Sequence, residues 1–262
     1  MRLAVSTLLT VLSSARAGDV ERIRPNAPDK QMVESQQYRS GVQMTEDELE
    51  QAMAVRIHVL AEYQASGGAR PRNCTADMRP KLPACKQDTL EWCWATCITD
   101  LDYYYNTSES RTCADIECDV VSKQMGKNCC GKPRAAGCAI DAAPVKTITA
   151  MAKQYLHRDD IVTHPGPLAE DELITLLEHG VPMMMLFMNS RGGGHVELLG
   201  GCDPHQPYKL APNQNTYFLH DPMTESWMNK TYSDLVSGYG IQPPWAYAIY
   251  VPPSSRAIGV HA

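Results

Sequence analysis

The chain has 262 residues, and its 24 Lys and Arg against 30 Asp and Glu give a formal net charge of −6. This balance, without a cluster of basic residues, argues against a nucleic-acid partner, because phosphate binding depends on clustered Lys and Arg. The longest internal apolar run, Val181–Met188, is too short to span a bilayer, so we expect no membrane association after removal of an N-terminal signal.

The N-terminus has the features of a secretory signal peptide. Residues 1–17 have a basic start, a short apolar run and an Ala15-Arg16-Ala17 ending, which predicts cleavage after Ala17. Ten cysteines fit an oxidising compartment in which thiols pair. We therefore predict a secreted protein, extracellular or in a lysosome-like compartment. In a eukaryotic host it would be a glycoprotein, with sequons at Asn73, Asn106 and Asn229.

Residues 18–78 form a polar N-terminal extension with one expected helix. Thr45 and Glu48 have the spacing of a capping box, and apolar residues recur at helical spacing as far as Tyr63. A linker rich in small residues, 66–73, follows the helix. The extension is either a removable pro-segment that covers a cleft or a helix packed on the domain.

Residues 79–262 have the length of one domain with a substantial core. Helical patterns come first, then strand patterns, which predicts an α+β domain with a helical lobe, an antiparallel sheet lobe and a cleft between them. The region Cys113–Cys138 reads as an irregular, cysteine-rich loop. The expected helices are Trp92–Tyr105, Ala142–Tyr155 and Ala169–His179, and the expected strands are Pro182–Met188, His195–Gly200, Thr216–His220 and Trp245–Val251.

Cys93 is the candidate nucleophile. It lies in the first turn of an expected helix, where unpaired backbone N–H groups stabilise a thiolate, as does a neighbouring imidazolium. Gln87 lies six residues earlier, where its amide and the Cys93 N–H can donate to one oxyanion. The alternatives are a half-cystine at Cys93 and a surface role for Gln87.

A thiolate needs a base, and the base needs an orienting partner. His195 follows three glycines and begins an apolar strand, and Asp221 ends the next strand directly before Pro222. Neighbouring antiparallel strands would bring the Asp221 carboxylate to the Nδ1 side of His195. Glu197 and His220 are rivals for the orienting and basic roles, and an Asp-Pro pair is also a common turn opener.

The remaining cysteines give a parity constraint. With Cys93 free, nine remain, so at least one more is unpaired or bonds another chain. The adjacent Cys129 and Cys130 do not easily pair with each other. A zinc site in this cluster is disfavoured by secretion and by the lack of Cys-x2-Cys spacing, so we predict no metal and no cofactor. The nearby partners for the adjacent pair are Cys113, Cys118 and Cys138.

These residues resemble papain-like cysteine peptidases. Gln87 six before Cys93, with Trp94 directly after it, is similar to the family's oxyanion and nucleophile motif. The second half resembles the branch of bacteriocin-leader peptidases and avirulence-effector peptidases. The matching segments run from Lys86 to Tyr250 and include Glu172–Pro182, Gly193-Gly-His195-Val, His220-Asp221-Pro222, Trp227 and Tyr232; the Cys129-Cys130 pair before Cys138 is similar to the effector branch.

The resemblance implies a papain-like endopeptidase that hydrolyses protein or peptide substrates with Cys93, His195, Asp221 and Gln87, without a cofactor. Papain itself has Asn at the position of Asp221, whereas the bacteriocin-type branch has Asp, as this chain does. The long pro-segment of cathepsins is not recognisable in residues 18–78. Two other functions use the same features. One is a transglutaminase-like acyl transferase, and the other is a non-catalytic, disulfide-stapled binding module.

Overall fold

The structure is a computed structural model. The expected signal peptide and the first part of the extension lie outside the described residues. These are 42–65, 72–106, 110–131, 133, 137–138, 143–188, 193–204, 214–239 and 243–253.

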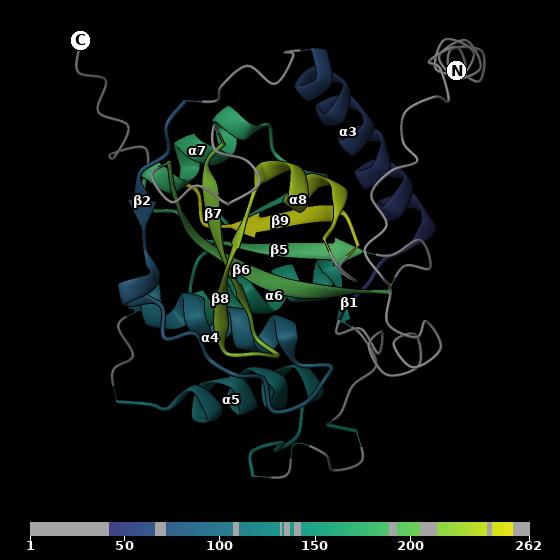
Figure 1. Ribbon diagram of the computed structural model, residues 1–262. Helices are drawn as coiled ribbons and strands as arrows, with labels where there is room; N and C mark the ends of the chain where they lie inside the picture. The colour runs from purple at the N-terminus through teal and green to yellow at the C-terminus, as the bar shows by residue number, and fades with distance from the viewer. Residues whose placement is uncertain are drawn as a thin grey trace, which may run out of the picture. The chain divides into compact units, whose positions relative to one another are not determined.

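A nine-stranded sheet forms the centre of the molecule, with the order β3-β1-β6-β5-β9-β4 (Figure 1). Strands β2 and β7 also pair with β6, and β8 pairs with β7. The pair β1–β3 is parallel and the others are antiparallel, so the sheet is mixed and the expectation of a purely antiparallel sheet is wrong. The strands are β1 Val42–Gln43, β2 Ala76–Asp77, β3 Ala143–Pro144, β4 Val162–Pro165, β5 Met183–Met188, β6 Gly193–Asp203, β7 Thr216–Asp221, β8 Ser226–Lys230 and β9 Trp245–Tyr250.

The four predicted strands are confirmed as β5, β6, β7 and β9. Every residue of β5, β7 and β9 is buried, as their apolar runs require. The Met183–Met185 run is fully buried core, where flexible side chains fill gaps. Because β6 carries His195 and pairs with β7, which ends at Asp221, the core strands also place the candidate site.

Helices cover both sides of the sheet. In Figure 1, α4, α5 and α6 lie on one side, and α3, α7 and α8 on the other. The predicted helices are confirmed as α3, α4, α6 and α7, and Thr45 and Glu48 form the expected capping box on α3. The bounds are α3 Glu46–Ala65, α4 Cys93–Asn106, α5 Cys113–Met125, α6 Val145–Leu156, α7 Glu170–Glu178 and α8 Tyr232–Ser237; a short 3-10 turn, η2, spans Arg79–Lys81.

The expectation of an irregular loop from Cys113 to Cys138 is wrong in its first half, which is helix α5. Thr112 caps this helix and exchanges hydrogen bonds with Asp115, and Gly126 ends it in the left-handed conformation at φ 63°. The high density of cysteines led us to expect a loop, although Thr112 and Gly126 are ordinary signals for the two ends of a helix. The helix packs against α4, so it is part of the support of Cys93.

Four disulfides join Cys74–Cys202, Cys85–Cys113, Cys118–Cys130 and Cys129–Cys138. The free cysteines are Cys93 and Cys97, so the parity prediction is confirmed. Cys113, Cys118, Cys129, Cys130 and Cys138, considered above as a zinc site and disfavoured, are all in disulfides. Within the described ranges, no helix combines the length and the apolar character that crossing a bilayer requires.

The N-terminal extension contacts the domain through a strand and a helix. Strand β1 inserts between β3 and β6, and its two residues pair with Gly194 and Gly193. Helix α3 packs against β9 and β4 so closely that a Cβ on Gly166 would lie 2.5 Å from the Val55 Cβ. Strand β1 therefore lies directly beside the segment that leads to His195.

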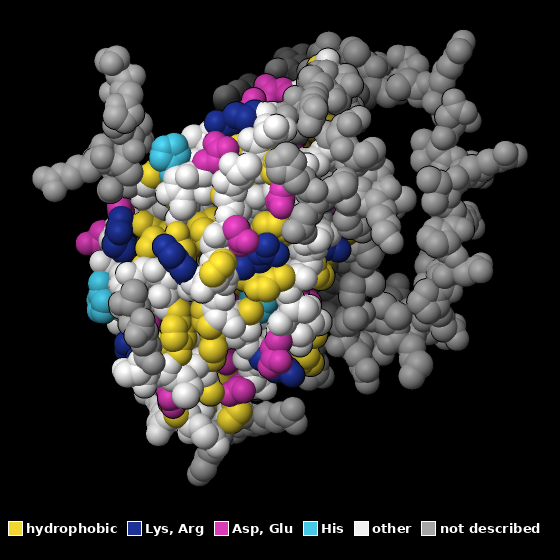
Figure 2. All heavy atoms as spheres, turned by 60° about the vertical axis from the view of Figure 1, so that its left-hand side comes forward, with side chains coloured by type: hydrophobic (Ala, Val, Ile, Leu, Met, Phe, Trp, Pro, Cys, Tyr) yellow, Lys and Arg dark blue, Asp and Glu magenta, His cyan; other side chains and the backbone are white. Residues whose placement is uncertain are grey.

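Figure 2 shows one face of the molecule, on which basic and acidic side chains are interspersed among separate hydrophobic groups.

Candidate active site

Cys93 is the first residue of α4, and its side chain is fully buried. Its sulfur lies close enough to the ring of His195 to raise the pKa of that ring. Cys97, one turn later, donates to the Val196 carbonyl oxygen at 3.7 Å, and burial, followed by the nearby Asp100, raises its thiol pKa well above the ordinary value. Of the two free thiols, Cys93 is the one that raises the pKa of the His195 ring.

His195 and Asp221 lie together as expected, 2.8 Å apart between Nε2 and Oδ1. The expected ring nitrogen is wrong: Asp221 binds Nε2, which leaves Nδ1 for the thiol. The glycine before His195 is a steric requirement, because a Cβ on Gly194 would lie 2.2 Å from the Phe187 carbonyl oxygen on β5. That close approach fixes where the ring enters the site.

The electrostatics favour a charged ring. Burial opposes the charge, but the Cys93 sulfur and the Asp221 carboxylate outweigh it and raise the pKa of His195 well above its ordinary value. For Asp221, burial raises the pKa, yet the hydrogen bonds from His195 and from the Met223 N–H outweigh it, so the pKa is lowered. An imidazolium at His195 beside the Asp221 carboxylate is the charge state that these contacts support.

Glu197 lies near the pair but has a different partner. Its side chain is fully buried, and the Tyr239 hydroxyl donates to its Oε2. Burial, offset in part by His195 and Tyr239, raises its pKa to about 7. Ligand atoms of His195, Glu197 and Asp221 lie within 4.8 Å of one another, so these three are the described residues able to hold a metal ion. Here His195 and Asp221 are instead hydrogen-bonded to each other.

His220, the other rival base, is not part of this group. It is fully buried, with Nδ1 3.2 Å from Asp100 Oδ2 and its ring 5.4 Å from the Trp227 ring. It pairs with an acid on α4 and so links α4 to β7, which carry Cys93 and Asp221.

Gln87 lies in the loop before α4 and is 8 % exposed. Its N–H donates to the Pro222 carbonyl oxygen at 3.0 Å, which ties the loop to the turn beside Asp221. Its Nε2 donates to the Thr89 carbonyl oxygen at 2.7 Å, and the same nitrogen carries a second N–H. The oxyanion role of Gln87 stays a prediction, and its donor would be the second N–H of Gln87 Nε2.

Several groups around the site were not predicted from the sequence. Tyr239 and Asp100 are separated in sequence from the residues they support, and no local pattern marks them. Glu117 does have a local signal, because it is a carboxyl group on the apolar face of α5, between Ile116 and Val120.

Comparison with known proteins adds no relative. No family model matches the chain, and no curated protein is significantly similar to it.

Proposed function

We propose that this protein is a secreted, papain-like cysteine endopeptidase, with α4 to α6 in one lobe and the sheet in the other. The series Cys93–His195–Asp221 carries the proposal, with the Cys93 sulfur beside the His195 ring and the ring hydrogen-bonded to Asp221. One member comes from the start of a helix and two from paired strands, and a Gln loop is tied to the same turn.

In the proposed reaction, the Cys93 thiolate attacks a peptide carbonyl carbon. The tetrahedral oxyanion accepts hydrogen bonds from the Gln87 amide and from the Cys93 N–H. His195, as imidazolium, gives its proton to the leaving amine, which departs as the thioester forms. Water, deprotonated by the now neutral ring, then hydrolyses the thioester and regenerates the thiolate. Asp221 holds the ring through Nε2 and favours its charged form.

The test has two parts. Brief treatment with iodoacetamide followed by peptide mapping should label Cys93, and hydrolysis of a peptide library should be lost in Cys93→Ala. A Cys93 that stays unlabelled, in a protein that cleaves nothing, would favour a non-catalytic binding module.

Acyl transfer to an amine is the second candidate, because it shares every step as far as the thioester. Product analysis with an added primary amine separates the two. Free acid as the main product supports the peptidase, and an amide supports the transferase.

A further inference from the structure

Glu117 is a buried carboxyl group that the proposed reaction does not use. It lies on α5 with no exposed surface. Its Oε1 accepts hydrogen bonds from the Asp88 N–H at 3.2 Å and from the Thr96 hydroxyl at 2.9 Å. Asp88 follows Gln87 in the chain, and Thr96 lies one turn after Cys93. One oxygen therefore joins the loop of the proposed oxyanion donor to the helix of the proposed nucleophile.

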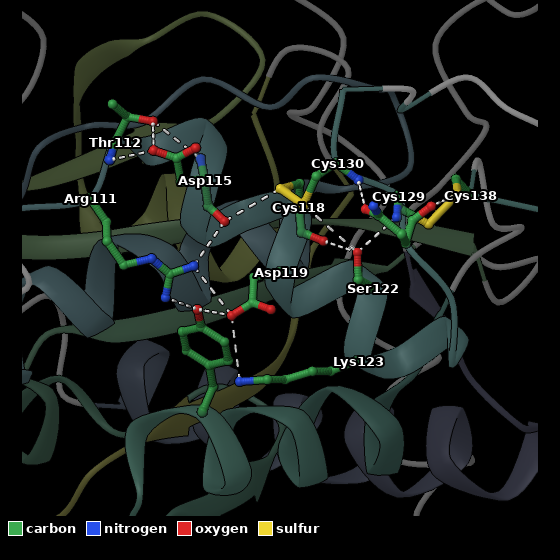
Figure 3. The surroundings of a disulfide bond; sticks show 12 residues. Arg111, Thr112, Asp115, Cys118, Asp119, Ser122, Lys123, Cys129, Cys130 and Cys138 are labelled. Carbon is green, nitrogen blue, oxygen red and sulfur yellow. Dashed lines mark hydrogen bonds and ion pairs between the residues drawn. A yellow bond between two sulfur atoms is a disulfide. The ribbon is translucent and has the colours of Figure 1, made fainter.

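The support of Glu117 is itself rigid. Cys113, one turn before it on α5, forms a disulfide with Cys85 at the start of the same loop. On the other side of α5, Asp119 binds Arg111 and Lys123 (Figure 3). Cys118, directly before Asp119, forms a disulfide with Cys130. The helix is thus fixed on both sides.

The loop has other attachments on either side of Asp88. Besides the disulfide, its backbone is held by the bond from Gln87 to Pro222, by bonds from Ala84 and Cys85 to the Asp100 carboxyl group, and by the Thr89 carbonyl oxygen, which accepts from Trp92 N and Gln87 Nε2. The Asp88 N–H itself is held by Glu117. Without Glu117, the backbone N–H of Asp88 loses its acceptor, and the peptide plane that leads out of Gln87 is free to turn. An amide that is an ångström out of place loses much of its effect on a transition state.

We propose that Glu117 is a positioning residue, which fixes the loop so that the Gln87 amide meets the oxyanion formed at Cys93. This inference rests on the proposed function. The hydrogen bonds from Asp88 and Thr96 require an acceptor oxygen at Glu117, but they do not require that oxygen to carry a negative charge. Burial raises the pKa of Glu117 to about 8, consistent with a neutral carboxyl in this role.

The test compares two reactions of Cys93. Acylation by the p-nitrophenyl ester of N-acetylglycine passes through an oxyanion, whereas alkylation by iodoacetamide does not. Glu117→Leu should lower the acylation rate by about 10- to 100-fold, because the donor is displaced but not removed. Its alkylation rate should stay within about twofold, since the thiolate–imidazolium pair is intact. Glu117→Gln keeps the acceptor and should restore most of the acylation rate.

Two controls exclude a general structural effect. Asp119→Asn changes a carboxylate on the same helix away from the loop and should leave both rates unchanged. In a Gln87→Ala background, Glu117→Leu should cause no further loss of acylation, because both changes remove the same interaction. Glu117→Asp withdraws the oxygen by one methylene and should show a smaller, parallel loss in case the leucine variant does not fold.

Normal acylation in folded Glu117→Leu or Glu117→Asp, an equal loss of both rates, or an additive loss with Gln87→Ala would overturn the proposal. Absence of acylation at Cys93 in the parent protein is a separate result, which would refute the proposed function and this inference with it.

Discussion

Asp221 offers the sharpest test of the proposed site. Its Oδ1 accepts hydrogen bonds from His195 Nε2 at 2.8 Å and from the Met223 N–H at 2.9 Å. Asp221→Ala removes the acceptor, whereas Asp221→Asn keeps an oxygen in the same place and removes the charge. The two variants therefore separate orientation of the ring from stabilisation of its charge.

The size of the effect follows from the contact that is lost. A hydrogen bond to a charged partner contributes about 1.5–3 kcal/mol, so Asp221→Ala should lower kcat/KM by about 10- to 150-fold. Asp221→Asn should keep much more of the activity. Because the Asp221 carboxylate helps to raise the pKa of His195, its loss lowers that pKa, and the alkaline limb of the pH profile should move to lower pH.

The assay is kcat/KM against pH for both variants, with iodoacetamide labelling of Cys93 and thermal unfolding as controls for an intact site. Glu197→Gln is the matched competitor, since its carboxylate is buried nearby. Equal damage from Asn and Ala with unchanged pH limbs would refute the orienting role. If both variants are fully active and Glu197→Gln is inactive, the role belongs to Glu197.

Further predictions concern the thiols, the loop, a buried acid and the extension. At mildly acidic pH, iodoacetamide should label Cys93 and leave Cys97 unlabelled, as checked by peptide mapping. Gln87→Ala should lower kcat by about 10²–10³ with unchanged thermal unfolding. Glu117, whose pKa rises from 4.5 to about 8, binds its proton more tightly in the folded state. Stability should therefore fall between these pH values, by at most about 1.4 kcal/mol per pH unit, and this decline should weaken in Glu117→Gln in pH-dependent urea titrations. If the extension is a pro-segment, cutting at a protease site engineered into the linker and releasing residues 18–65, which contain no cysteine, should raise acylation; an equal rate indicates simple packing.

Local sequence patterns predicted the helices and strands whose own residues carry the signal for them. Strands β5 and β9 are apolar runs, and α3 carries a capping box, so periodicity and end signals were sufficient. Strand β1 is two residues long and exists only through its pairing with β3 and β6. No single-sequence pattern marks a strand of that kind. Its position beside Gly193 and Gly194 is therefore a product of tertiary structure.

The candidate site shows the same division. The adjacency of His195 and Asp221 followed from two neighbouring strands, but the ring nitrogen depends on a rotamer that the sequence does not encode locally. The buried acids Glu117 and Asp100 contact partners 29 and 15 residues away in the chain. These contacts were not predicted, because the partners of a buried carboxyl group are decided by packing and not by its neighbours in sequence.

The two free thiols show why packing decides the chemistry as well. Cys93 and Cys97 lie one turn apart on α4 and are both fully buried. Burial alone favours the neutral thiol, as it does for Cys97, whose hydrogen bond goes to a backbone carbonyl. Cys93 differs in lying beside the His195 ring, whose charge Asp221 supports. The proposed nucleophile thus depends on the pairing of β6 with β7, which brings His195 and Asp221 together, and a change that shifts this register should abolish the reaction of Cys93 without altering α4.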